Sequence, residues 1–181
     1  MSENKGHKKG GGKLSRSEVV TVRLDPKLRY MAELAARKQR RTLSSFIEWS
    51  IEQSLKEVLV VNASKGERSN LAQMAESLWD ISSPKRLVKL AQKCPELLNY
   101  KEERIWRLMD EWKALFDFYE DGSRRFRWEL LDSLWKEFEQ YGDEEITEKD
   151  LGWKVGEYFQ RTGLPSSALV IHSEPRYIDE I

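Results

Sequence analysis

The sequence holds little of the chemistry that disulfide frameworks, metal centres and membrane spans require. Its 181 residues include one cysteine, Cys94, and two histidines, His7 and His172. A single cysteine cannot form an intrachain disulfide, and two histidines far apart in sequence lack the companions of a zinc site. No apolar run approaches the roughly 20 residues that span a bilayer, and none at the N-terminus resembles a signal peptide. We therefore expect a cytoplasmic protein without a membrane segment, a bound metal or a cofactor.

The sequence also lacks the motifs of the common nucleotide-dependent enzymes. It contains neither a Walker phosphate-binding loop nor the glycine fingerprint of dinucleotide-binding folds. Carboxylates such as those of Glu144, Glu145 and Asp150 are more typical of a solvated helix face than of an acid–base pair. We predict no enzymatic activity. Cys94 stands in an apolar helical pattern just before Pro95, which favours a buried structural thiol.

Charge is balanced over the whole chain but distributed unevenly along it. Residues 1–57 carry 13 Lys and Arg against 7 Asp and Glu, whereas residues 58–181 carry 18 against 24. A basic first third suggests a module that faces nucleic acid, joined to an acidic, aromatic-rich part with a different task. Chance clustering of surface charge is the alternative.

Residues 1–17 are predicted to be a flexible basic arm. They have little apolar content to bury, and a run of three glycines lies among the lysines. Three of these lysines, Lys8, Lys9 and Lys13, are candidates for contacts with DNA phosphates. A solvated tail is the alternative.

Residues 19–24, Val-Val-Thr-Val-Arg-Leu, predict a strand with one apolar face. A strand places successive side chains on opposite faces, so alternate residues share a face. The apolar face holds Val20, Val22 and Leu24, and the other face holds Val19, Thr21 and Arg23.

Two helices are predicted after this strand. Asp25 suits an N-cap and Pro26 the first helical position, so the first helix should run over residues 26–38. After a basic turn at residues 39–41, Thr42 is a candidate N-cap for a second helix that reaches at least Lys56.

A lone strand leaves its backbone groups without partners, because no second strand lies nearby in sequence. We expect the same strand of another chain to complete a two-fold antiparallel ribbon that closes onto the helices. A two-stranded ribbon fits a DNA major groove, where Arg23 can bond guanine and Thr21 can meet a base edge. Pairing with residues 168–171 of the same chain is the alternative. The dimer core is predicted to comprise Val20, Val22, Leu24, Leu34, Phe46, Ile47 and Ile51.

The order strand, Asp-Pro, helix, short turn, Thr-Leu-Ser-Ser, helix resembles the ribbon-helix-helix superfamily, the class of the Arc and MetJ repressors. The resemblance covers about residues 18–56. It implies a dimeric DNA-binding module in which one strand face reads bases and the start of the second helix binds a phosphate. The implied base readers are Val19, Thr21 and Arg23, and the implied phosphate-binding residues are Thr42, Leu43 and Ser44.

Two residues depart from the pattern of that family. Arg40 occupies a turn position where members often have glycine, so it either strains the turn or adds a phosphate contact. Val19 is apolar where a polar base reader is common, which leaves base discrimination mainly to Thr21 and Arg23. Arg40 and Arg41 stand beside a helix N-terminus, whose dipole repels positive charge, and phosphate is therefore their expected neighbour.

The rest of the chain is predicted to be a helical domain. We assign residues 18–61 to the ribbon-helix-helix module, residues 62–70 to a linker and residues 71–181 to the helical domain. The longest apolar pattern spans residues 105–119 at helical spacing and stops at Asp121-Gly122. Further helices are expected over residues 131–141 and from Thr147 to about Gly163, and residues 168–171 fit a short strand.

The predicted fold is thus mainly α, and the predicted function is that of a sequence-specific DNA-binding protein. A transcriptional repressor is the first hypothesis, in a prokaryotic cell and associated with nucleoid or plasmid DNA. The alternative is a DNA-anchored interaction protein, either an antitoxin or a plasmid transfer or partition factor. Both hypotheses include double-stranded DNA, a homodimer that can assemble further on DNA, and a protein partner for the C-terminal domain. In that domain the basic residues Arg124, Arg125 and Arg127 are either a second anion contact or partners of local acids.

Overall fold

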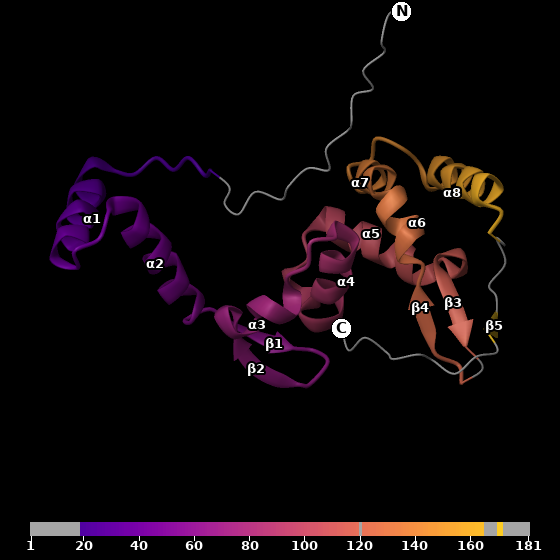
Figure 1. The fold of residues 1–181 in the computed structure, drawn as a ribbon, viewed down its shortest axis with the longest axis horizontal. Coiled ribbons are helices and arrows are strands. Elements are labelled where there is room, and N and C mark those ends of the chain that lie inside the picture. The colour runs from indigo at the N-terminus through magenta and orange to yellow at the C-terminus, as the bar shows by residue number, and fades with distance from the viewer. Residues whose placement is uncertain (1–18, 120, 165–169, 172–181) are drawn as a thin grey trace, which may run out of the picture. The chain divides into compact units, whose positions relative to one another are not determined.

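The computed structural model describes residues 19–119, 121–164 and 170–171. The chain divides into two compact units, Met1–Ser50 and Ile51–Ile181. The described residues are mainly helical, as the sequence predicted, and the second unit adds two small sheets (Figure 1). Lys8, Lys9 and Lys13 of the predicted basic arm lie outside the described residues.

The first unit contains the first predicted helix and most of the second. α1 spans Pro26–Lys38, with the predicted bounds, and α2 begins at Leu43 and ends at Leu55, one residue before its predicted minimum. The predicted strand over residues 19–24 does not form in the single chain, where these residues are neither helix nor strand. A strand is stabilised by hydrogen bonds to a neighbouring strand, and the predicted neighbour belongs to a second chain, so this strand stays a prediction.

The segment predicted as a linker, residues 62–70, belongs to a β-hairpin. β1 (Leu59–Asn62) pairs antiparallel with β2 (Glu67–Asn70) across a turn in which Gly66 has a φ of +66°. The side chain of Asn62 accepts a hydrogen bond from the backbone N–H of Ser64 at 3.1 Å. Asparagine and glycine favour such turns for these reasons, and the polar composition of the segment concealed a hairpin.

The second unit contains two separate apolar clusters. α3 (Leu71–Leu78) follows the hairpin directly, capped by Asn70, and α4 spans Ser83–Lys93. A short 3₁₀ turn, η1 (Pro95–Leu97), then leads into α5 (Tyr100–Glu111). The smaller cluster is Val60, Met74 and Cys94, so the sole cysteine is buried as predicted.

The long helix predicted over residues 105–119 ends early. α5 stops at Glu111, a 3₁₀ turn η2 (Lys113–Leu115) follows, and β3 (Phe116–Tyr119) pairs antiparallel with β4 (Arg124–Phe126). Phe116 lies opposite Phe126, with ring centroids 4.3 Å apart. The spacing of Phe116 and Phe118 fits a strand as well as a helix, and this cross-strand aromatic pair stabilises the strand.

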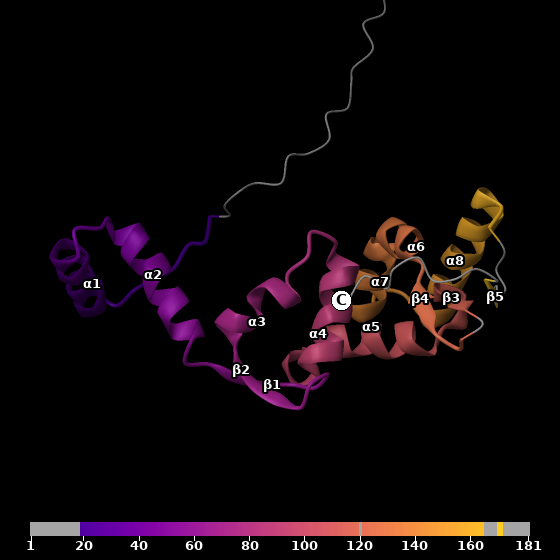
Figure 2. The ribbon, with the colours of Figure 1, turned by 60° about the horizontal axis from the view of Figure 1, so that its bottom comes forward.

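Three helices complete the second unit, and Figure 2 shows α5 beneath the first two of them, α6 and α7. The helix predicted over residues 131–141 is two helices, α6 (Trp128–Ser133) and α7 (Trp135–Gly142). α8 (Glu148–Thr162) has the predicted capping box of Thr147 and Asp150, and it ends at Gly163 with a φ of +69°. β5 (Val170–Ile171) pairs parallel with β3, so the alternative pairing with residues 19–24 is not observed.

Apolar side chains from α4 through α8 form the main core. The rings of Phe116 and Phe138 are completely buried there, together with aliphatic residues of α5, α6 and α8. The second unit therefore has a core of its own. Among the described helices none is long and apolar enough to cross a membrane.

Candidate nucleic-acid interface

The start of α1 has the predicted capping geometry. The Asp25 carboxylate accepts hydrogen bonds from the backbone N–H groups of Lys27 at 2.9 Å and Leu28 at 3.3 Å. Pro26 occupies the first helical position, where its missing N–H costs nothing. The extended segment of residues 19–25 therefore leads into α1 through a fixed cap.

The turn between α1 and α2 holds Arg40 in a left-handed conformation, with a φ of +56°. The N–H of Arg40 donates to the carbonyl of Arg37 at 3.1 Å, and that of Arg41 donates to the carbonyl of Ala36 at 2.9 Å. These two bonds form a Schellman motif, which usually has glycine at the left-handed position. The predicted departure at Arg40 is therefore a real conformational cost, about 1 to 2 kcal/mol for a residue with a side chain.

Thr42 caps the start of α2, as predicted. The Thr42 hydroxyl accepts a hydrogen bond from the N–H of Ser45 at 3.1 Å, and the carbonyl of Thr42 accepts from Phe46 at 2.9 Å. The first N–H groups of a helix have no acceptor within the helix. Those of Leu43 and Ser44 have none among the described residues either, which leaves two adjacent donors at the positive end of the helix dipole.

Basic side chains surround this helix start. Arg40 and Arg41 are exposed, and the guanidinium carbon of Arg41 lies 5.3 Å from the ring centroid of Trp49 on α2. Stacking on an aromatic face restricts a flexible arginine without neutralising its charge. The turn therefore holds positive charge beside the free N–H groups of α2.

The predicted base-reading residues are all exposed in the single chain. Val19, Thr21 and Arg23 belong to the extended segment before α1. Arg23 has no carboxylate partner within the part of the chain that the structure describes. Its charge is available for an external acceptor.

Most of the predicted dimer-core residues remain accessible to solvent. Val20 is 79% exposed and Val22 is 64% exposed, and Leu34 and Ile51 are also exposed. Leu24, Phe46 and Ile47 are half-buried. Among residues 19–50 only Ala36 is buried, so a single copy of this unit encloses almost no core.

The arginine cluster in the second unit is mostly occupied by local partners. Arg124 pairs with the carboxylate of Asp110, and Arg127 Nε donates to Asp117 at 2.8 Å with its side chain almost fully buried. Arg125 is exposed on β4. The structure therefore favours the reading of this cluster as partners of local acids over that of an anion site.

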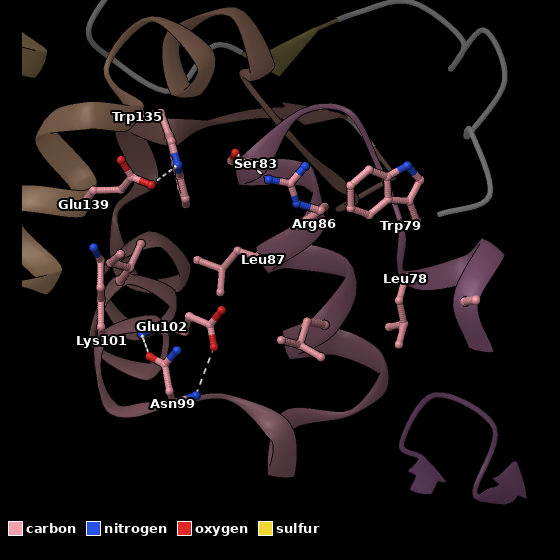
Figure 3. Close-up of a pocket in the computed structure, with 13 residues that line it drawn as sticks. Leu78, Trp79, Ser83, Arg86, Leu87, Asn99, Lys101, Glu102, Trp135 and Glu139 are labelled. Atoms are coloured by element: carbon pink, nitrogen blue, oxygen red, sulfur yellow. Dashed lines mark hydrogen bonds between the residues drawn. The ribbon is translucent and has the colours of Figure 1, made fainter. Parts of the chain in front are cut away.

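The second unit contains a groove that sequence reasoning missed. It has a volume of about 740 Å³ and an apolar floor that includes Leu87 and Leu90. Figure 3 shows Leu78 and Trp79 on one side of it and Glu102 and Glu139 on the other. The signal in the sequence was weak, because Trp79 and Arg86 stand in a loop and on a short helix without a motif.

The described residues include no cluster of His, Cys, Asp or Glu suited to a metal ion. Burial raises the pKa of the Cys94 thiol, which keeps it protonated and unreactive. Comparisons of the chain with protein-family models, with curated proteins and with solved structures found no match.

Proposed function

We propose that the chain is a sequence-specific DNA-binding protein, a transcriptional regulator, in which two N-terminal units pair through residues 19–24. One observation carries this proposal. The first unit is folded into two capped helices, yet it leaves the apolar side chains of its leading segment and of both helices in solvent. A symmetric dimer would bury these residues and satisfy the backbone groups of the leading segment in one step.

Charge and geometry support DNA as the ligand of that dimer. A two-fold ribbon would present Thr21 and Arg23 twice on its outer face, at a width that a major groove accepts. The free N–H groups of Leu43 and Ser44, beside Arg40 and Arg41, would meet phosphates on either side of the ribbon. The first unit thus combines a base-reading face with phosphate-binding helix starts.

A DNA-anchored interaction protein is the second candidate, and the groove in the second unit favours it. An apolar groove bordered by tryptophan and arginine has the composition of protein interfaces. The antitoxin form of this candidate is disfavoured, because the second unit has its own buried core and needs no toxin to fold.

Selection of bound duplexes from a random pool with the full chain tests the proposal. We expect enrichment of an inverted repeat, bound by two copies of the chain. Arg23→Ala should lose the preference at one position of each half-site, whereas Arg125→Ala, which removes an exposed arginine of the second unit, should keep it. Failure to enrich any duplex sequence would refute sequence-specific binding.

A further inference from the structure

The groove of the second unit is built to meet an apolar surface. Most polar groups on its border already have partners within the chain. Arg86 donates to the carbonyls of Asp80 and Ile81 at 2.7 and 3.2 Å and to the Ser83 hydroxyl at 2.8 Å. Glu139 accepts from the indole N–H of Trp135 at 3.0 Å. An occupant therefore gains little from hydrogen bonds here and must be recognised by shape and charge.

Two large apolar side chains project beside the groove. Trp79 is 64% exposed and Ile81 is 68% exposed, both in the segment between α3 and α4. Trp79 rests on the guanidinium of Arg86, with 4.9 Å between the guanidinium carbon and the ring centroid. Tryptophan and arginine are the residues most often found at the energetic centres of protein interfaces. This segment therefore places two large apolar side chains next to a groove whose floor is apolar.

The charged groups on the two sides of the groove are suited to a contact between two copies of the groove. Arg86 lies on the Trp79 side and has no carboxylate partner among the described residues (Figure 3). Glu102 and Glu139 lie on the opposite side together with Lys101, whose charge is paired with the carboxylate of Asp143 at 2.6 Å. In an isologous contact the same surface patch of two copies meets across a two-fold axis. The Trp79 side of the groove in one copy can then face the Glu102 side of the groove in the other. Such a rotation places Arg86 of each copy against the acidic side of its partner.

We propose that the occupant of this groove is a second copy of the chain, whose Trp79 and Ile81 insert between α3 and α5. The contact is separate from the N-terminal ribbon and does not depend on it. Where the ribbon forms, however, it would strengthen the contact. Two chains already joined by the ribbon would meet at the groove at a raised effective concentration.

Sedimentation velocity of four full-length proteins tests this proposal. They are the wild type, the ribbon variant Val20→Glu/Val22→Glu, the groove variant Trp79→Ser/Ile81→Ser, and the combination of both. All four substituted residues are exposed in the single chain, so the substitutions remove no side chain from the buried core of the second unit. Circular dichroism checks that helix content is unchanged.

The ribbon variant should remain a dimer, and the combined variant should be a monomer. Loss of a central tryptophan should raise the dissociation constant of the groove contact at least about 30-fold. Trp153→Ser, which removes a 71% exposed tryptophan on α8, is the matched control and should leave the dimer intact in the ribbon variant.

Two results would overturn the groove contact. One is a ribbon variant that is monomeric up to about 100 µM, and the other is a ribbon variant whose dimer survives Trp79→Ser/Ile81→Ser. A groove variant that becomes monomeric with its ribbon intact would instead support the groove contact and refute the ribbon dimer. The two proposals can therefore fail separately.

Discussion

Replacing Arg40 by glycine separates the two roles of this residue. Its φ of +56° costs about 1 to 2 kcal/mol relative to glycine. Glycine also gives the unfolded chain more conformational freedom, which lowers the free energy of unfolding by about 0.5 to 1 kcal/mol. We therefore expect Arg40→Gly to stabilise the first unit by about 0.5 to 1 kcal/mol. Hydrogen exchange of α1 and α2, at a fixed protein concentration, measures this change as slower local opening.

The same substitution should weaken DNA binding. A dimer would lose two phosphate contacts, so the slope of log affinity against log salt should fall by about 2. The loss should be equal on specific and scrambled duplexes, because a phosphate contact carries no sequence information.

Arg40→Ala is the matched variant, because alanine removes the charge but keeps a side chain at the left-handed position. It should reduce the salt slope as glycine does, without the gain in stability. If Arg40→Gly opened faster than the wild type, the Schellman turn would not have the geometry described here. An unchanged salt slope in both variants would remove Arg40 from the phosphate contacts.

Three further substitutions test other parts of the molecule. Arg23→Ala should reduce the free energy of binding to the selected duplex by about 1 to 3 kcal/mol per lost guanine contact, with little change on a scrambled duplex. Lys8→Ala should weaken binding to both duplexes alike. Fluorescence anisotropy measures the affinity of each variant for each duplex, and equal losses on both for Arg23→Ala would refute its role as a base reader. Thr42→Ala removes the hydroxyl that caps α2 and should destabilise the first unit by about 1 kcal/mol, measured by hydrogen exchange. An unchanged exchange rate would show that the cap does not stabilise the unit. Gly142→Ala places a Cβ 2.7 Å from Ile105 Cδ1 between α5 and α7, so thermal unfolding should reveal a loss of about 1 to 3 kcal/mol. Gly156→Ala in α8 meets nothing within 4 Å and should instead stabilise by about 0.5 to 1 kcal/mol; the same sign for both would contradict the packing of α5 against α7.

Local chemistry made several elements predictable from the sequence. Asp25-Pro26, Thr42, and the capping box of Thr147 with Asp150 each marked a helix start that the structure confirms. Such signals act within one turn of the chain and need no knowledge of distant residues. Arg40 was singled out in another way, because members of the family that the segment resembles often have glycine at this turn position.

Elements that depend on distant partners were not predictable in this way. The strand of Phe116 is stabilised by Phe126 across a hairpin, a contact that apolar spacing alone does not reveal. The groove required α3, α4, α5 and α7 to come together around Leu87. The segment of residues 19–24 is a special case, because its expected partner belongs to another chain.

Cysteine substitution along that segment tests the ribbon most directly. The native Cys94 is buried and will not interfere, so a single cysteine can be placed in turn at residues 20, 21, 22 and 23 of the full chain. A disulfide requires Cα atoms about 4.4 to 6.8 Å apart, a distance that two-fold antiparallel strands reach only next to their symmetry axis. Under mild oxidation we predict an efficient interchain disulfide at one position or two adjacent ones, with a sharp decline on either side. Absence of an interchain disulfide at all four positions, or equal cross-linking at all of them, would contradict the ribbon and with it the proposed reading of DNA.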